Sequence, residues 1–231
     1  MHLIQTAVDM PAAIRHCRAV GLPATSLRDE NVVAKTVLTE CFAGPVVRPW
    51  AVIAKHAVTM TIAGYSENAA PELAQRRALA LPSLQQAVAE PIGCSMPEFE
   101  VGQRLAFQTR IVPTMHVRDG DRTLTRDAFL VAVERSSEGV ADRGAVYADY
   151  LRERMAGAVI EEVTLANFRL ARVARRHAGS GSGWREHTAP VAELAGVLRV
   201  TDPAQFRAFT ATGAGRQRAY GYGFLRLTPI G

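Results

Sequence analysis

Residues 193–227 read ELAGVLRVTDPAQFRAFTATGAGRQRAYGYGFLRL and contain three kinds of element in succession. Residues 194–200 predict a strand. Thr201-Asp202-Pro203 is typical of a helix start, because an aspartate cap precedes a proline at the first helical position. Residues 205–212 continue as helix, a glycine-rich loop follows, and residues 224–228 predict a final strand. The stretch therefore favours the closing part of a mixed α+β domain.

The sequence before this stretch alternates strands and helices in the same way. We expect strands at 2–8, 101–117 and 159–175, two strands within 50–65, and helices at 12–20, 29–42, 69–90 (interrupted by Pro82), 127–134 and 147–155. Residues 91–97, PIGCSMP, are the best candidate linker. The order predicts an α+β protein of two tandem ferredoxin-like (RRM-like) domains, 1–95 and 98–231, with a C-terminal glycine-rich loop.

Positive charge is concentrated near the C-terminus. The 231 residues carry a net charge of +5, whereas residues 164–231 contain ten arginines and three carboxylates. A bias in genomic composition would also enrich arginine, but it would spread the arginines evenly. A guanidinium-rich segment of this kind favours a phosphate-bearing partner.

Other classes of protein are disfavoured by composition. No apolar run approaches the roughly 18–20 residues that span a bilayer, and the first residues lack the pattern of a signal peptide. The three cysteines, Cys17, Cys41 and Cys94, match neither a disulfide framework nor a CxxC metal site. We expect a cytoplasmic protein that needs no membrane, metal or cofactor.

The glycine-rich loop is the strongest chemical signal. Gly213, Gly215, Gly221 and Gly223 surround two cations, Arg216 and Arg218. Amide groups in such a loop can bind phosphates while the arginines supply charge. The loop matches neither a Walker A motif nor the Rossmann fingerprint. The alternative is a turn that serves only the geometry of the sheet.

A second signal is FRLARVARRH at residues 168–177. On a strand, Phe168, Leu170 and Ala174 would share one face, opposite Arg169 and Arg175. Residues 179–183, GSGSG, would form the tip that leads to the next strand. The four arginines would then line a basic hairpin suited to a phosphate track: Arg169, Arg172, Arg175 and Arg176. The alternative is a charged edge strand that blocks aggregation.

The run at 193–227 resembles the C-terminus of the CasE-type CRISPR-associated endoribonucleases. Residues 1–8, 104–117 and 145–175 resemble further parts of that family. The resemblance implies a protein that binds the hairpin of a CRISPR repeat RNA and cuts at the 3′ base of its stem. It implies metal-free attack by a ribose 2′-OH, which leaves a 2′,3′-cyclic phosphate. The protein would be monomeric alone and would stay with the guide RNA beside other Cascade-type subunits.

The chain departs from this family at the family's first helix, which carries a Tyr-x-x-His pattern. Asn31 stands at the position of the tyrosine and Ala34 at that of the histidine. Either cleavage has been lost, or Ala34 is an engineered replacement, or other residues supply the chemistry. For the last case the candidates are Lys35, Arg28 and His16.

The remaining histidines are assigned by context. We expect His2 and His116 to be structural and His56 to be exposed, while His177 and His187 flank the expected tip and could touch phosphate. Two other functions stay open at this stage. One is a catalytically silent hairpin-binding subunit, and the other is a small-molecule-binding regulatory protein.

Overall fold

The computed structural model describes residues 1–120, 122–137, 139–176 and 184–230. It divides into two units by internal contacts. Unit 1 comprises Met1–Pro97, Arg172–Thr188 and Arg218–Gly221, and unit 2 comprises Glu98–Ala171, Ala189–Gln217 and Tyr222–Gly231. The sequence-based division into 1–95 and 98–231 placed the two later segments of unit 1 in the second domain.

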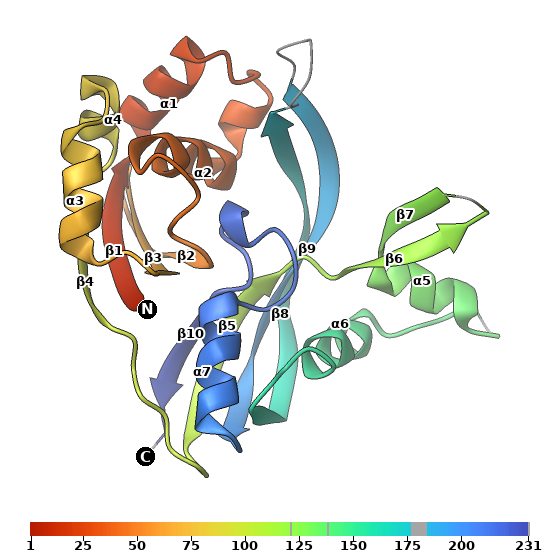
Figure 1. Ribbon diagram of the computed structural model, residues 1–231. Coiled ribbons are helices and arrows are strands. Elements are labelled where there is room, and N and C mark those ends of the chain that lie inside the picture. Colours follow the sequence, from red (N-terminus) through yellow and green to blue (C-terminus); the bar gives the residue numbers. More distant parts are fainter. Residues whose placement is uncertain (121, 138, 177–183, 231) are drawn as a thin grey trace. The chain divides into compact units, whose positions relative to one another are not determined.

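Unit 1 contains a four-stranded antiparallel sheet in the order β2-β3-β1-β4. Helices α1, α2 and α4 pack against one another in this unit (Figure 1). This strand order is the one that a β-α-β-β-α-β chain produces in a ferredoxin-like domain. The elements are β1 (His2–Asp9), α1 (Met10–Ala19), η1 (Ser26–Arg28), α2 (Glu30–Cys41), β2 (Trp50–His56), β3 (Thr59–Ser66), α3 (Ala70–Ala78), α4 (Pro82–Ala87) and β4 (Ile92–Ser95).

Helices α1 and α2 begin at aspartate caps. The Asp9 carboxylate accepts the Ala12 amide at 2.8 Å, and Asp29 accepts the amides of Asn31 and Val32 at 2.9 and 3.3 Å. Each cap satisfies donors that a helix terminus leaves without a partner.

Residues 91–97 are not simply a linker, which corrects the expectation from sequence. Ile92–Ser95 forms β4 and pairs antiparallel with β1, from His2 opposite Ser95 to Gln5 opposite Ile92. The edge of β1 supplies the hydrogen-bonding groups that pair with β4. Gly93 is suited to the site, because an added Cβ would lie 2.8 Å from the Leu3 carbonyl oxygen.

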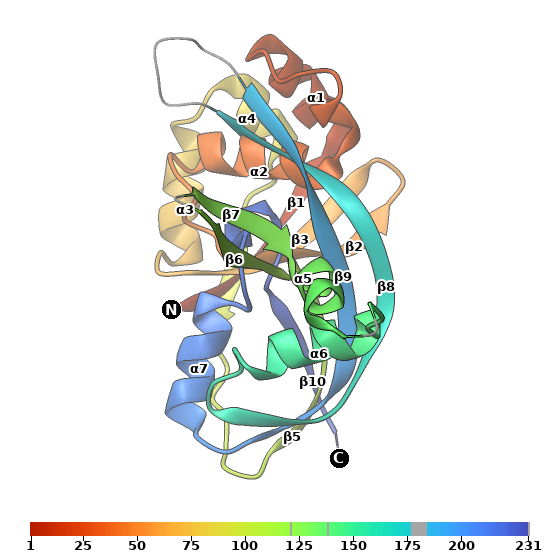
Figure 2. The same ribbon diagram turned by 90° about the vertical axis from the view of Figure 1, so that its right-hand side faces the viewer.

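Unit 2 contains a second four-stranded sheet, in the order β10-β5-β9-β8, and a separate β6-β7 hairpin (Figure 2). Counted within the sheet, this order repeats that of unit 1. The elements are β5 (Arg104–Ile111), β6 (Thr114–Asp119), β7 (Arg122–Asp127), α5 (Ala128–Arg135), α6 (Arg143–Arg152), β8 (Ala158–Arg176), β9 (Trp184–Val200), α7 (Pro203–Thr212), η2 (Arg218–Tyr220) and β10 (Leu225–Pro229). The last residues of β8, the first of β9, and η2 fall within unit 1.

One detail of unit 2 differs from the prediction, and a second concerns the basic strand. The single strand expected at 101–117 is two strands, β5 and β6, which separate at Val112-Pro113 because proline lacks an amide hydrogen. In β8, Leu170 is 65% exposed and Ala171 is 2% exposed. Leu170 therefore lies on the exposed side of β8, and Ala171 lies on the buried side.

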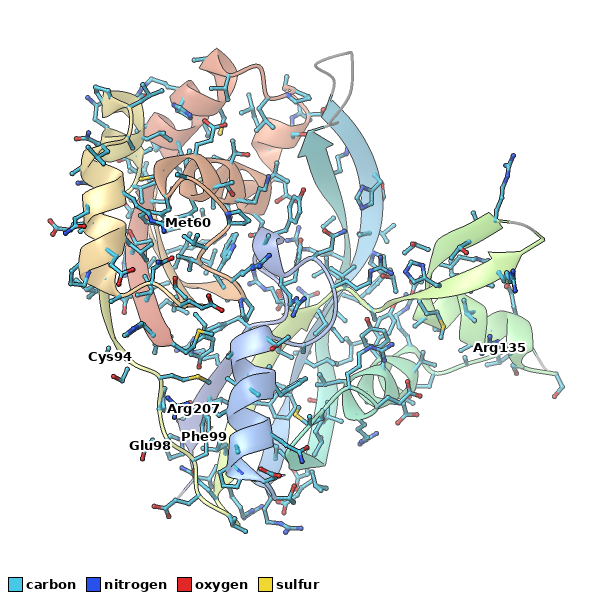
Figure 3. All side chains as sticks on the ribbon, viewed as in Figure 1. Met60, Cys94, Glu98, Phe99, Arg135 and Arg207 are labelled. Atoms are coloured by element: carbon cyan, nitrogen blue, oxygen red, sulfur yellow. The ribbon has the colours of Figure 1, made fainter. Side chains whose placement is uncertain are left out.

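Each unit has its own apolar core. The core of unit 1 includes Ile4, Phe42 and Met60, the last of which is labelled in Figure 3. The core of unit 2 includes Phe107 and Phe206, and the Phe206 ring packs edge-on against Phe99 with centroids 4.8 Å apart. None of the helices in the described residues has the length and apolar character of a membrane span.

Loss of the α2 cap should lower stability measurably. Asp29→Ala removes the acceptor of two amides and should reduce the free energy of unfolding by about 1 kcal/mol. Asp29→Ser keeps an N-cap acceptor and should retain most of the stability of the parent. Denaturant unfolding of the full chain measures the difference, and equal stability of the alanine variant and the parent would contradict the assignment.

Candidate functional site

The start of α2 is held by a distant piece of the chain. Asn31 is 5% exposed, and its Nδ2 donates to the Tyr220 carbonyl oxygen at 3.0 Å. Trp50 is 1% exposed, and its Nε1 donates to the Ala219 carbonyl oxygen at 3.0 Å. All four residues belong to unit 1. The side-chain amide of Asn31 therefore has a structural role: it attaches the segment around Tyr220 to the start of α2.

Gly221 allows this close approach. Its φ is +81°, a conformation that side chains rarely adopt. An added Cβ would lie 2.6 Å from the Trp50 ring and 2.9 Å from Asn31 Nδ2. The glycine at 221 therefore has a steric role against the Trp50 ring.

Ala34 lies in the core of unit 1 and is 0% exposed. The resemblance aligns Asn31 with the family's tyrosine and Ala34 with its histidine. The Asn31 amide is hydrogen-bonded to a backbone carbonyl, and the Ala34 methyl group is buried. Neither can exchange a proton with an RNA near neutral pH.

The three substitute candidates lie in different surroundings. His16 is 3% exposed, with Nδ1 2.9 Å from Ser83 Oγ and Nε2 2.8 Å from Glu40 Oε2. This ring connects α1, α2 and α4 inside unit 1 and is closed to a large substrate. Arg28 is exposed at the end of η1, and Lys35 is half-buried on α2 with its Nζ 5.3 Å from the Tyr220 ring centroid.

Much of the backbone of the glycine-rich loop is used internally. The Gly213 amide donates to the Phe209 carbonyl at 2.7 Å, the Ala214 amide to Gly223 at 2.8 Å, and the Gly223 amide to Arg110 at 2.6 Å. An added Cβ at Gly223 would lie 2.4 Å from the Ala214 carbonyl oxygen. These contacts support the geometric explanation for Gly223, and they leave Gly215, Arg216 and Arg218 as the phosphate-binding candidates of the loop.

Arg216 lies beside His116, a histidine that the sequence predicts to be structural. Its Nη1 is 2.8 Å from His116 Nε2, and both side chains are at the surface of unit 2. Tyr150 packs nearby, and the Arg154 guanidinium stacks 3.5 Å from its ring centroid. Burial raises the pKa of Tyr150, while the positive charges of Arg154 and Arg216 act in the opposite direction. Arg216, His116, Tyr150 and Arg154 are called the Arg216 cluster below.

The basic strand is described in part. Arg169 and Arg172 are exposed on β8, and no described carboxylate pairs with either. The predicted contacts of Arg175 and Arg176 depend on side chains outside the described set, as do those of the expected 179–183 tip and His177. Other arginines of this sheet do pair with a carboxylate. Arg199 shares Glu161 with Arg104, at 3.0 and 2.9 Å.

Metal ligands do not converge in the described residues, where no group of three or more His, Cys, Asp or Glu side chains could hold an ion. Burial raises the pKa of the Cys17 thiol to about 12 and that of Cys41 to about 11. Both therefore stay protonated near neutral pH and are poor metal ligands.

A family model described as "CRISPR associated protein" matches residues 25–229. The chain belongs to this family. The resemblance identified from the sequence is thus confirmed. No curated protein sequence matches the chain.

Solved structures of CRISPR-associated proteins share the fold. CRISPR endoribonuclease Cse3 bound to a 19 nt RNA superimposes with a TM-score of 0.62 and 17% identity, over 99% of this chain and 100% of the other. Cas6e from Escherichia coli K-12 gives 0.55 and 15%, over the whole of both chains. A chain of a CRISPR RNA-guided surveillance complex gives 0.58 and 13%, also over the whole of both. These likenesses confirm the tandem ferredoxin-like α+β fold.

Gly221 and Gly215 have similar φ values, so alanine variants of the two distinguish the cost of a steric clash from the cost of backbone strain. Gly221→Ala should lower the free energy of unfolding by about 3 kcal/mol, because strain and the clash with Trp50 add. Gly215→Ala should cost about 1 kcal/mol, since its added Cβ would meet only Tyr150, at 3.4 Å. Denaturant unfolding compares the two, and equal losses would show that the Trp50 contact does not constrain residue 221.

Proposed function

We propose that this protein binds the hairpin of a CRISPR repeat RNA and cleaves the precursor guide RNA at the 3′ base of the stem. Membership of the CRISPR-associated family and the shared fold with an RNA-bound endoribonuclease support this proposal. The observation that carries it is the exposure of Arg169 and Arg172 on β8 with no described carboxylate partner. Such arginines bind phosphates without first breaking an ion pair.

A structured hairpin fits the composition better than a single strand does. Only 6% of the residues are aromatic, which limits the stacking of unpaired bases. Recognition of double-stranded RNA depends mainly on its shape, its phosphates and its 2′-hydroxyl groups. Arginine-rich strands supply these contacts.

The reaction proposed is attack of a ribose 2′-OH on the adjacent phosphate, which breaks the bond to the 5′ oxygen and leaves a 2′,3′-cyclic phosphate. It needs a proton acceptor for the 2′-OH, a proton donor for the 5′ oxygen and positive charge beside the phosphorane. The candidate for positive charge in unit 2 is Arg216, and the separate candidates in unit 1 are Arg218 and Lys35. After cleavage the protein would stay with the guide RNA as a subunit of a Cascade-type complex, and in isolation it would be a monomer.

The second candidate is a silent subunit that binds the same hairpin without cutting it. The burial of Asn31 and Ala34 favours this function, because these positions hold no group that transfers protons. Both candidates require the same arginine contacts and differ only in whether the RNA is cut.

Loss of the two β8 arginines should weaken binding and its dependence on salt. Arg169→Ala together with Arg172→Ala should reduce hairpin affinity about tenfold or more near physiological salt. The slope of log affinity against log salt should become shallower by about 2, because two phosphate contacts are lost. Filter binding of a repeat hairpin at several salt concentrations measures both.

Arg207 is a matched control on α7 of unit 2 (Figure 3). Arg207→Ala removes one positive charge, where the double variant removes two, from a helix that the proposal does not use, so affinity and slope should stay close to those of the parent. Equal effects of the double variant and the control would contradict the assignment of β8 as the RNA-binding strand.

A further inference from the structure

The proposed cleavage lacks a proton-transfer group at the positions where the family places one. Asn31 donates its side-chain amide to a carbonyl, Ala34 is buried, and the His16 ring is enclosed by Ser83 and Glu40. A group that removes a proton from RNA must instead be exposed and must lie beside positive charge that binds the phosphate.

His116 meets both conditions. It lies on β6, the first strand of the β6-β7 hairpin that Figure 1 labels in unit 2. Its side chain is exposed. Its Nε2 is 2.8 Å from Arg216 Nη1, although the two residues are 100 positions apart in the chain. The hairpin and the glycine-rich loop therefore bring an imidazole and a guanidinium into direct contact.

The contact with Arg216 makes Nε2 of His116 the hydrogen-bond acceptor. A guanidinium can only donate hydrogen bonds, so Nε2 of His116 must be the acceptor and must carry a lone pair. The other ring nitrogen, Nδ1, lies 3.4 Å from Thr125 Oγ1 on the facing strand β7. A ring nitrogen that carries a lone pair is the histidine atom that acts as a general base.

The remaining donors of Arg216 are suited to a phosphate. A guanidinium has five N–H groups, of which the contact with His116 uses one. Phosphate oxygens are stronger acceptors than an imidazole nitrogen, because the bonds that they accept are assisted by charge on both sides. A phosphodiester that binds Arg216 would thus compete for the N–H that now points at Nε2 and would leave Nε2 beside the bound phosphate.

We propose that His116 is the proton-transfer residue of the cleavage reaction and that Arg216 binds the phosphate under attack; this inference rests on the proposed function. Nε2 of His116 accepts the proton of the 2′-OH while the 2′ oxygen forms its bond to phosphorus. The bond from phosphorus to the 5′ oxygen breaks, and the imidazolium returns the proton to that oxygen. The products are a 2′,3′-cyclic phosphate and a 5′-hydroxyl, and His116 ends neutral. Arg216 supplies positive charge to the phosphorane.

Single-turnover cleavage of the CRISPR repeat hairpin from the source genome, with saturating full-length protein, tests this proposal. His116→Ala should lower the cleavage rate by about 10²-fold to 10⁴-fold, which is the usual contribution of general acid–base catalysis. Hairpin affinity should change less than threefold. Added imidazole should restore part of the rate to the alanine variant, because a free imidazole can occupy the vacated space and accept the proton. A merely structural role of His116 would not produce this rescue.

Two controls separate the possible failures. His56→Ala removes an exposed histidine from the end of β2 and should leave the rate unchanged. If the parent cuts the hairpin and His116→Ala cuts equally fast, or is slower without rescue by imidazole, the role of His116 is overturned. If the parent binds the hairpin but does not cut it, this inference fails while hairpin binding stands. If the parent does not bind the hairpin, the proposed function itself fails.

Discussion

Two buried donors in unit 1 require acceptors that come from near the other end of the chain. Asn31 Nδ2 and Trp50 Nε1 bind the carbonyl oxygens of Tyr220 and Ala219, across sequence separations of 189 and 169 residues. A buried donor without a partner costs about 1–3 kcal/mol, so the segment that supplies these acceptors is part of unit 1. Residues 1–97 therefore do not complete unit 1, and residue 221 must be small enough to lie against the Trp50 ring.

The hydrogen bonds to Tyr220 and Ala219 change the interpretation of α2, the helix that the resemblance identifies as carrying the family's tyrosine and histidine. The family resemblance aligns Asn31 with a catalytic tyrosine, but the Asn31 side chain donates its Nδ2 to the Tyr220 carbonyl of the returning segment. Ala34 is enclosed by the core of the same unit. The start of α2 therefore has a structural role in this protein, and any proton transfer must depend on groups elsewhere. The Arg216 cluster of unit 2 supplies an exposed imidazole in contact with a guanidinium.

Local signals in the sequence predicted much of the fold. The caps at Asp9 and Asp29, and Pro82 at the start of α4, are set by residues within a few positions of one another. Contacts between distant segments were not predictable in this way. The strand β4 exists because the edge of β1 is available to pair with it, and the separate hairpin β6-β7 has no counterpart in the expected strand order.

The same distinction applies to the candidate site. The concentration of arginine was visible in the sequence, but the ion pairs of Arg104 and Arg199 with Glu161 depend on register across strands. The expected alternation placed Phe168 and Leu170 on one face of the strand, but it could not show that Leu170 is exposed. His116 carries no local mark that distinguishes it from a structural histidine, since its partner Arg216 is 100 residues away.

The most direct test of this account is cleavage of the repeat hairpin in the presence of EDTA, with mass analysis of the products and a 2′-deoxy substitution at the scissile nucleotide. The account predicts cutting that survives EDTA, a product that ends in a 2′,3′-cyclic phosphate, and no cutting of the 2′-deoxy hairpin. Tight binding without cutting, or cutting that persists with the 2′-deoxy hairpin, would contradict the proposed 2′-OH mechanism.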